Sequence, residues 1–126
     1  MESLKEKKAW REVKASQKFL NAFRGLYVFG ATTRYLVIHL VGALGAIALG
    51  FYFSILSFEW IAIIFCIGFV IVAEVFNTAI EIDIDLTSPQ YHPYARDTKD
   101  VAAAAVLLSV FVAFIIGSIV FLPYFV

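Results

Sequence analysis

Three long stretches of this sequence contain no Asp, Glu, Lys or Arg, and they limit strongly what the chain can fold into. Residues 35–58, 60–73 and 101–126 are free of these charges, and the second stretch continues through a polar segment to position 84. An apolar segment of about 20 residues is long enough to span a bilayer as a helix. The 126-residue chain is 62% hydrophobic, whereas soluble domains are about 45–50% apolar. The sequence therefore predicts an integral membrane protein with three transmembrane helices.

The net charge of zero conceals an uneven distribution of basic residues. Eight of the ten Lys and Arg residues precede the first span, and Arg96 and Lys99 lie between the second and third spans. The connection at Phe58 and Glu59 and the C-terminal segment carry none. Because basic residues concentrate on the cytoplasmic side of membrane proteins, we expect the N-terminus and the loop 86–99 to be cytoplasmic and the C-terminus to face outward.

We expect one domain, residues 1–126, that begins with an amphipathic surface helix. Aromatic and aliphatic residues between positions 10 and 27 recur at spacings of three, four or seven among basic residues, which is typical of such a helix. Asp97 is the expected N-cap of the last span. Cys66 is the only cysteine, so no internal disulfide forms, and we expect no cleavable signal peptide. The expected segments are the surface helix at 1–30 and transmembrane helices at 31–58, 59–85 and 98–126.

Carboxylates interrupt the second span, although each costs roughly 2.5–3.5 kcal/mol at the centre of a span. The polar residues of this segment are Glu74, Asn77, Thr78, Glu81 and Asp85. At 3.6 residues per turn, their spacings of three and four place them on one helical face. Carboxylate, amide and hydroxyl oxygens are hard donors suited to Mg²⁺, and a carboxylate can also abstract a proton. The stripe therefore indicates a functional site.

The loop and the start of the third span add basic residues on the same side of the membrane as this stripe. Arg96 and Lys99 can act as counter-ions for phosphate groups, which phosphoryl transfer requires together with a positioned metal and a proton acceptor. Structural roles remain open: Glu74 and Glu81 could instead form an ion network with Lys99 or Arg34. A divalent-ion carrier is a further function that an acidic stripe allows.

The motif Glu74-x-x-Asn77-Thr78-Ala79-Ile80-Glu81-x-x-x-Asp85, followed by Tyr91-His92-Pro93 and Lys99-Asp100, closely resembles the prokaryotic diacylglycerol kinase and undecaprenol kinase family. The likeness extends across nearly the whole chain and includes Ile38-His39, although a histidine inside a span is more often a satisfied core group than a catalyst. The resemblance implies an all-α homotrimeric bundle in the bacterial inner membrane. It also implies active sites shared between subunits, and no nucleic-acid partner.

The same resemblance implies an ATP- and Mg²⁺-dependent kinase that phosphorylates the hydroxyl of a membrane lipid alcohol. Glu74 matches the family's general base on that hydroxyl. Asn77 and Glu81 match residues that organise the metal and the ATP phosphates. The remaining nucleotide-site positions correspond to Asp85, His92, Lys99 and Asp100.

One position departs from the family pattern, and the resemblance leaves the choice of lipid substrate open. Thr33 stands where many members have a glutamate that binds metal together with the residue matching Glu81. Its hydroxyl oxygen is a neutral donor, so Mg²⁺ should bind more weakly here than to a glutamate. Tyr91-His92-Pro93 and Leu122-Pro123 look more like the undecaprenol branch, which favours undecaprenol as the acceptor. The alternatives are a diacylglycerol kinase that makes phosphatidic acid and a catalytically degenerate lipid-binding trimer.

Overall fold

The computed structural model of this chain describes residues 14–126, and every regular element in that range is a helix. The helices are α2 (Ala15–Thr32), α3 (Leu36–Phe53), α4 (Ser57–Thr87) and α5 (Pro93–Phe125). One compact unit ends at Thr32, and Thr33–Val126 forms a second. By length and composition, α3, α4 and α5 can each cross a membrane. The predicted all-α membrane fold with three spans is therefore confirmed.

Helix α2 carries the apolar face that was expected of a surface helix. Its large apolar side chains are exposed except for Phe29, which is buried, and the rings of Phe19 and Phe23 meet edge to face with centroids 5.3 Å apart. Polar side chains also pair along the helix, where Gln17 Nε2 donates to Asn21 Oδ1 at 3.1 Å. An exposed apolar face of this kind suits the membrane interface. The part of the expected helix before residue 14 lies outside the described residues.

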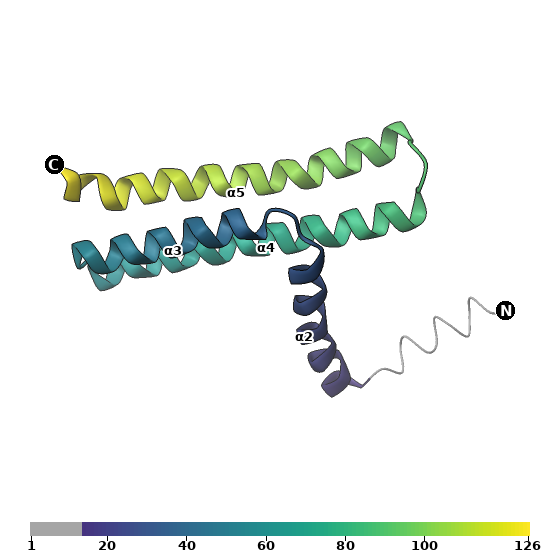
Figure 1. The fold of residues 1–126 in the computed structure, drawn as a ribbon, viewed down its shortest axis with the longest axis horizontal. Coiled ribbons are helices and arrows are strands. Elements are labelled where there is room, and N and C mark those ends of the chain that lie inside the picture. The colour runs from purple at the N-terminus through teal and green to yellow at the C-terminus, as the bar shows by residue number, and fades with distance from the viewer. Residues whose placement is uncertain (1–13) are drawn as a thin grey trace. The chain divides into compact units, whose positions relative to one another are not determined.

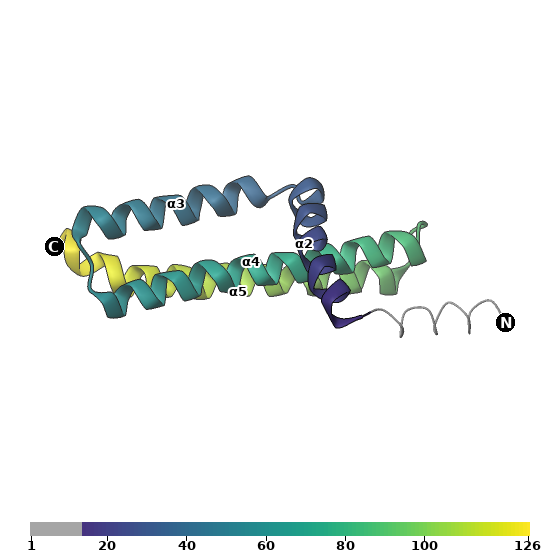
Figure 2. The same ribbon diagram turned by 90° about the horizontal axis from the view of Figure 1, so that it is seen from below.

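The three spans form a bundle in which α4 and α5 pack most extensively as an antiparallel pair, and α3 contacts both (Figures 1 and 2). The α3–α4 connection and the C-terminus lie at one end of this bundle, and the α4–α5 loop lies at the other. Helices α4 and α5 are the longer elements. Their loop end therefore extends past the start of α3 (Figure 1).

The best-packed apolar core lies at the end of the bundle that holds the C-terminus. Its buried members are Ile55, Ile63, Val120 and Phe121. Beside them, a Cβ atom at Gly50 would lie 2.5 Å from the ring of Trp60, so only glycine lets the indole approach this closely. The Glu59 carboxylate accepts from the Tyr124 hydroxyl at 2.6 Å and from the Leu56 amide at 3.1 Å. This contact ties the start of α4 to the end of α5.

The α3–α4 turn comes earlier than the sequence suggested. Helix α3 ends at Phe53, and Ser54 adopts a left-handed conformation with φ of 50°. The Ile55 amide donates to the Gly50 carbonyl at 3.1 Å, and the Ser54 amide donates to the Phe51 carbonyl at 3.3 Å. This pair of bonds is the Schellman arrangement that closes a helix. The predicted boundary at 58 and 59 was therefore wrong, because no glycine or proline announces the turn.

The start of α5 also differs from the expectation. The helix begins at Pro93, and His92 is its N-cap, with Nδ1 accepting from the Tyr94 amide at 3.2 Å. Proline suits the first helical position because the amide it lacks has no helical partner there. Asp97 is therefore not the cap, and Lys99 lies within the helix rather than in its first turn.

Candidate active site

One face of α4 is buried along most of the helix, and it changes from apolar to polar near the middle. The buried residues are Ile63, Cys66 and Val70, followed by Glu74, Asn77 and Thr78. Glu74 is only 4% exposed. A buried carboxylate is unfavourable unless other groups satisfy it, so its partners determine what this site can do.

Both oxygens of the Glu74 carboxylate meet polar side chains from the chain around the start of α3. Thr33 Oγ1 donates to Oε1 at 3.3 Å, and His39 Nε2 lies 3.3 Å from Oε2. Thr33 Oγ1 also lies 3.0 Å from the hydroxyl of Thr78. If Thr78 donates to Thr33, one chain of hydrogen bonds runs through both hydroxyls to the carboxylate. The carboxylate is thereby held in one orientation while it retains lone pairs for a further donor.

Asn77 and Glu81 form a second polar pair one turn farther along α4. Asn77 Nδ2 donates to Glu81 Oε1 at 3.4 Å. The other end of this amide, Oδ1, is buried and has no hydrogen-bond partner among residues 14–126. The Asn77 amide oxygen and the exposed Glu81 carboxylate are oxygen donors from which a Mg²⁺ site can be built, because Mg²⁺ takes one or two carboxylates and completes its shell with water and phosphate.

A larger metal cage is not present in residues 14–126. No group of three or more His, Cys, Asp or Glu side chains in that range is arranged to hold a metal. Thr33 contacts Glu74 and Thr78, whereas Glu81 contacts Asn77. The two residues expected to share a metal, Thr33 and Glu81, are therefore joined to different neighbours.

The nucleotide-site residues expected from the sequence come together at the α4–α5 loop. A cavity of about 380 Å³ lies deeper in the bundle, but a separate one of about 290 Å³ lies at this loop. The Lys99 ammonium meets Asp85 Oδ1 at 2.6 Å, which links the end of α4 to the second turn of α5. The predicted residues that line the loop cavity are Asp85, His92, Lys99 and Asp100.

Arg96 also lines the loop cavity, and its guanidinium is held by neighbours. Arg96 NH1 donates to the Tyr91 hydroxyl at 3.1 Å, and NH2 donates to Asp97 Oδ1 at 3.2 Å. Two cations, Arg96 and Lys99, therefore stand at one cavity. Asp85 and Asp100 line the same cavity, so it offers cations that can pair with phosphate oxygens without carrying a net positive charge.

His39 is the site residue that sequence reasoning undervalued. The sequence favoured a satisfied core polar group, and the structure shows which group satisfies it, because the ring lies against Glu74 with the side chain 12% exposed. The sequence did contain a signal for this contact, because an ionisable residue inside a span usually pairs with another polar group and marks a functional site. No ion pair in the described part of the chain joins Glu74 or Glu81 to Lys99 or Arg34, so the structural network considered above is not the arrangement seen.

Comparison with known proteins gives consistent matches over most of the chain. Residues 20–121 match the family described as prokaryotic diacylglycerol kinase. A Bacillus subtilis protein named undecaprenol kinase is 36% identical over 107 residues, which cover 85% of this chain and 87% of the relative. A Synechocystis protein named diacylglycerol kinase is 37% identical over 111 residues, which cover 83% of this chain and 61% of the relative. A Helicobacter pylori protein with the same name is 36% identical over 84 residues, or 66% of each chain.

Proposed function

This chain belongs to the prokaryotic diacylglycerol kinase family and is a membrane lipid kinase, and on that premise we propose that it phosphorylates undecaprenol with ATP and Mg²⁺. The observation that carries the proposal is the buried Glu74 carboxylate, which Thr33 and His39 hold through both of its oxygens. A general base must be positioned before its proton affinity matters. Glu74 meets that condition, and its partner His39 lines the apolar cavity inside the bundle.

The reaction assigned to this site is an in-line transfer. Glu74 takes the proton from the lipid hydroxyl as the hydroxyl oxygen bonds to the γ-phosphorus, and the bond from that phosphorus to the bridging oxygen breaks. ADP then leaves with the bonding electrons, and the lipid becomes its monophosphate. Most of the rate enhancement in phosphoryl transfer comes from positioning and from neutralising charge on the phosphate oxygens.

Lys99 and Arg96 are the groups assigned to the phosphate charge. Both line the loop cavity, where Asp85 holds the Lys99 ammonium at 2.6 Å. A fixed ammonium acts on developing negative charge without having to reorganise during the reaction. The other members of the nucleotide site are His92 and Asp100, which line the same cavity.

Glu81 and Asn77 are the residues assigned to Mg²⁺, with Thr33 as a weaker neutral donor. The unpartnered Asn77 Oδ1 and the exposed Glu81 carboxylate supply oxygen of the type that Mg²⁺ prefers. When bound, the metal neutralises charge on the phosphates and orients them. Asn77 Nδ2 orients the Glu81 carboxylate through the 3.4 Å hydrogen bond.

Undecaprenol is favoured for two reasons. The match to the relative named undecaprenol kinase covers 87% of that relative, and Tyr91-His92-Pro93 resembles the undecaprenol kinase branch of the family. Diacylglycerol is the second candidate acceptor, since two of the relatives reported above are named diacylglycerol kinase. The proposed setting is the bacterial inner membrane, with the N-terminus and the α4–α5 loop in the cytoplasm. That orientation rests on the distribution of basic residues. A homotrimer with shared active sites is the proposed assembly.

The test is phosphate transfer from labelled ATP by the purified protein in mixed micelles. Undecaprenol and diacylglycerol are supplied in parallel, with and without Mg²⁺, and the Glu74→Gln variant serves as the blank. Mg²⁺-dependent labelling of undecaprenol in excess of diacylglycerol is expected. Preferential labelling of diacylglycerol would reverse the substrate assignment, and labelling of neither lipid by a folded protein would overturn the kinase.

A further inference from the structure

Thr78 uses its hydroxyl differently from the other Ser and Thr side chains that lie beyond the first turn of a described helix. Such hydroxyls can donate back to the carbonyl three or four residues earlier. Within residues 14–126, the ones that do so belong to Thr32, Thr87, Thr98, Ser109 and Ser118. The Thr78 hydroxyl instead meets Thr33 Oγ1 at 3.0 Å. It therefore serves a contact between segments rather than its own helix.

The direction of this hydrogen bond follows from Glu74, the third member of the chain. A general base must be ionised before it takes a proton, and an ionised carboxylate can only accept hydrogen bonds. Thr33 Oγ1, which lies 3.3 Å from Glu74 Oε1, is therefore the donor to it. Because a hydroxyl has one proton to donate, the Thr33 oxygen accepts from Thr78. The chain of donation runs from Thr78 to Thr33 to Glu74.

Thr33 depends on such a partner because it lies outside the helices. It belongs to the short connection after α2 ends at Thr32 and before α3 begins at Leu36. Its side chain makes two hydrogen bonds, and both go to residues of α4 that are one turn apart, Glu74 and Thr78. Both of these partners are buried. Thr78 is thus the contact that fixes Thr33 against α4 independently of the carboxylate.

We propose that Thr78 is a positioning residue of the active site, which acts through Thr33 to hold Oε1 of the Glu74 carboxylate. The inference rests on the proposed function and adds to it a residue that takes no part in the proton or phosphoryl transfer itself. Hydrogen bonds in series polarise one another, so the bond from Thr78 strengthens the bond from Thr33 to the carboxylate. The base is then held in the orientation that the transfer requires.

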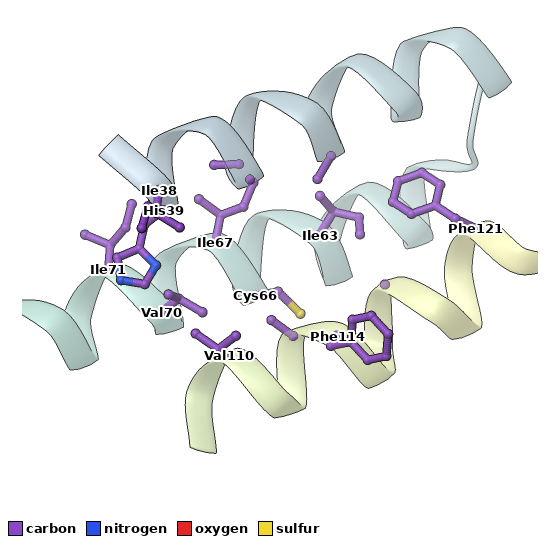
Figure 3. Close-up of a pocket in the computed structure, with 15 residues that line it drawn as sticks. Ile38, His39, Ile63, Cys66, Ile67, Val70, Ile71, Val110, Phe114 and Phe121 are labelled. Carbon is purple, nitrogen blue, oxygen red and sulfur yellow. The ribbon is translucent and has the colours of Figure 1, made fainter. Parts of the chain in front are cut away.

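The hydroxyl pair and His39 hold different oxygens of the same carboxylate. His39 Nε2 lies 3.3 Å from Oε2, and the His39 ring lines the apolar cavity at the end beside Ile71 (Figure 3). Thr33 and Thr78 are not among the residues that line this cavity. Removal of the Thr78 hydroxyl should therefore leave the cavity unchanged and disturb the orientation of the base.

The test compares variants of residue 78 that keep or remove the hydroxyl, with labelled ATP and whichever of the two lipids the wild type phosphorylates. Thr78→Val and Thr78→Ala both lack it. Each is expected to lower kcat about tenfold and to leave the KM for ATP and for the lipid unchanged, because a misplaced base acts on the transition state alone. Thr78→Ser keeps the hydroxyl and should stay close to the wild type. If Thr78→Val does not fold, the comparison of Thr78→Ala with Thr78→Ser decides the outcome.

Ser109→Ala is the matched control for loss of a buried hydroxyl. Ser109 is 1% exposed, and its hydroxyl donates to the Val106 carbonyl of its own helix. Turnover of this variant should match the wild type. A similar fall in kcat in Ser109→Ala and Thr78→Ala would show a general effect of core hydroxyls and would overturn the assignment.

A double-mutant cycle tests whether Thr78 acts through Thr33. Thr33→Val removes the hydroxyl that contacts the carboxylate directly. If the two hydroxyls act in series, the double variant Thr33→Val/Thr78→Val should be no slower than Thr33→Val alone, since coupled residues are not additive. Losses that multiply would show that Thr78 acts by another route, which contradicts the proposal.

Infrared difference spectroscopy gives a readout that does not depend on catalysis. The carboxylate stretching band of Glu74 is identified by its absence from Glu74→Gln. It should shift in both Thr33→Val and Thr78→Val, because Oε1 loses or weakens its donor, and it should not shift in Ser109→Ala. If the wild type phosphorylates no lipid but the band shifts, the kinase proposal fails and the hydrogen-bond chain stands. An active wild type whose kcat is unchanged by Thr78→Val leaves the kinase standing and overturns the role of Thr78.

Discussion

His39 Nε2 lies 3.3 Å from Glu74 Oε2 and joins the first turn of α3 to the middle of α4. On the other side of the same carboxylate, Thr33 Oγ1 lies 3.3 Å from Oε1. Two residues therefore decide the orientation of the proposed base. They are six positions apart in the sequence, and each is more than thirty positions from Glu74. This relationship can be tested separately from the chemistry of the base itself.

Replacing His39 should lower turnover without weakening nucleotide binding. A hydrogen bond to a charged group contributes roughly 1.5–3 kcal/mol, so His39→Leu is expected to reduce kcat about tenfold or more while the KM for ATP is unchanged. His39→Gln keeps a side-chain N–H donor and should recover much of the activity. Equal losses in the two variants would argue that His39 contributes packing rather than positioning.

Glu74→Gln should abolish turnover and leave the protein folded. Gln preserves the size of the side chain but cannot take a proton, and a general base typically contributes roughly 100- to 10,000-fold. Binding of labelled ATP and the elution volume of the detergent-solubilised protein should match the wild type. Activity near the wild-type level would remove Glu74 as the base.

Lys99→Ala should affect activity far more than stability. Lys99 and Asp85 form a close ion pair, but their side chains are 41% and 68% exposed, and exposed pairs contribute only about 0–1 kcal/mol. Turnover is expected to fall about 100-fold, as for loss of one group that stabilises transition-state charge. Thr98→Ala is the control, because Thr98 is exposed on the same turn of α5, bonds only the Tyr94 carbonyl and does not line the cavity. A loss of thermal stability that accounts for the loss of activity would identify the Lys99 pair as structural.

Thr33→Glu should strengthen the response to Mg²⁺. Thr33 Oγ1 is 3.3 Å from Glu74, so a glutamate there stands beside the proposed base, and it adds a charged oxygen donor to the metal site assigned to Glu81. The Mg²⁺ concentration for half-maximal activity is expected to fall, and thermal stability without Mg²⁺ is expected to fall through like-charge repulsion. Thr33→Gln is the uncharged control. If the wild type is inert and Thr33→Glu is active, the degenerate lipid-binding reading replaces the kinase.

Gly50→Ala should destabilise the bundle at the end that holds the C-terminus. The added Cβ would lie 2.5 Å from the Trp60 ring, and overpacking of this kind costs about 1–3 kcal/mol. Gly45→Ala, on the same helix with open space around Cβ, should be neutral or stabilising, because alanine favours the helix. Thermal unfolding in detergent compares the two. Unfolding temperatures that do not differ would show that the ring moves aside at no cost.

Some of this protein was predictable because it depends on patterns within one segment. The charge-free stretches predict three spans, since a helix must be long and apolar to cross a bilayer. The spacing of the acidic stripe predicts a shared face, and Glu74, Asn77 and Thr78 are all buried on α4. Asp85, His92, Lys99 and Asp100 line one loop cavity, and their role in binding a nucleotide stays a prediction.

The misplaced boundaries have local causes that a sequence pattern does not reveal. The α3–α4 turn uses Ser54 in a left-handed conformation rather than a glycine, so the usual signal is missing. At α5, both His92 and Asp97 can cap a helix, and the proline that follows His92 decides the outcome.

The sequence by itself determined the fold class and the positions of the polar residues along each helix, because hydropathy and helical periodicity act over short distances in the chain. Only the tertiary structure decided which of those residues meet. It brought Thr33 and His39 to Glu74, paired Lys99 with Asp85, and left an apolar cavity that ends at His39. These contacts depend on how α3 and α5 pack against α4, which is set by side chains far apart in the chain.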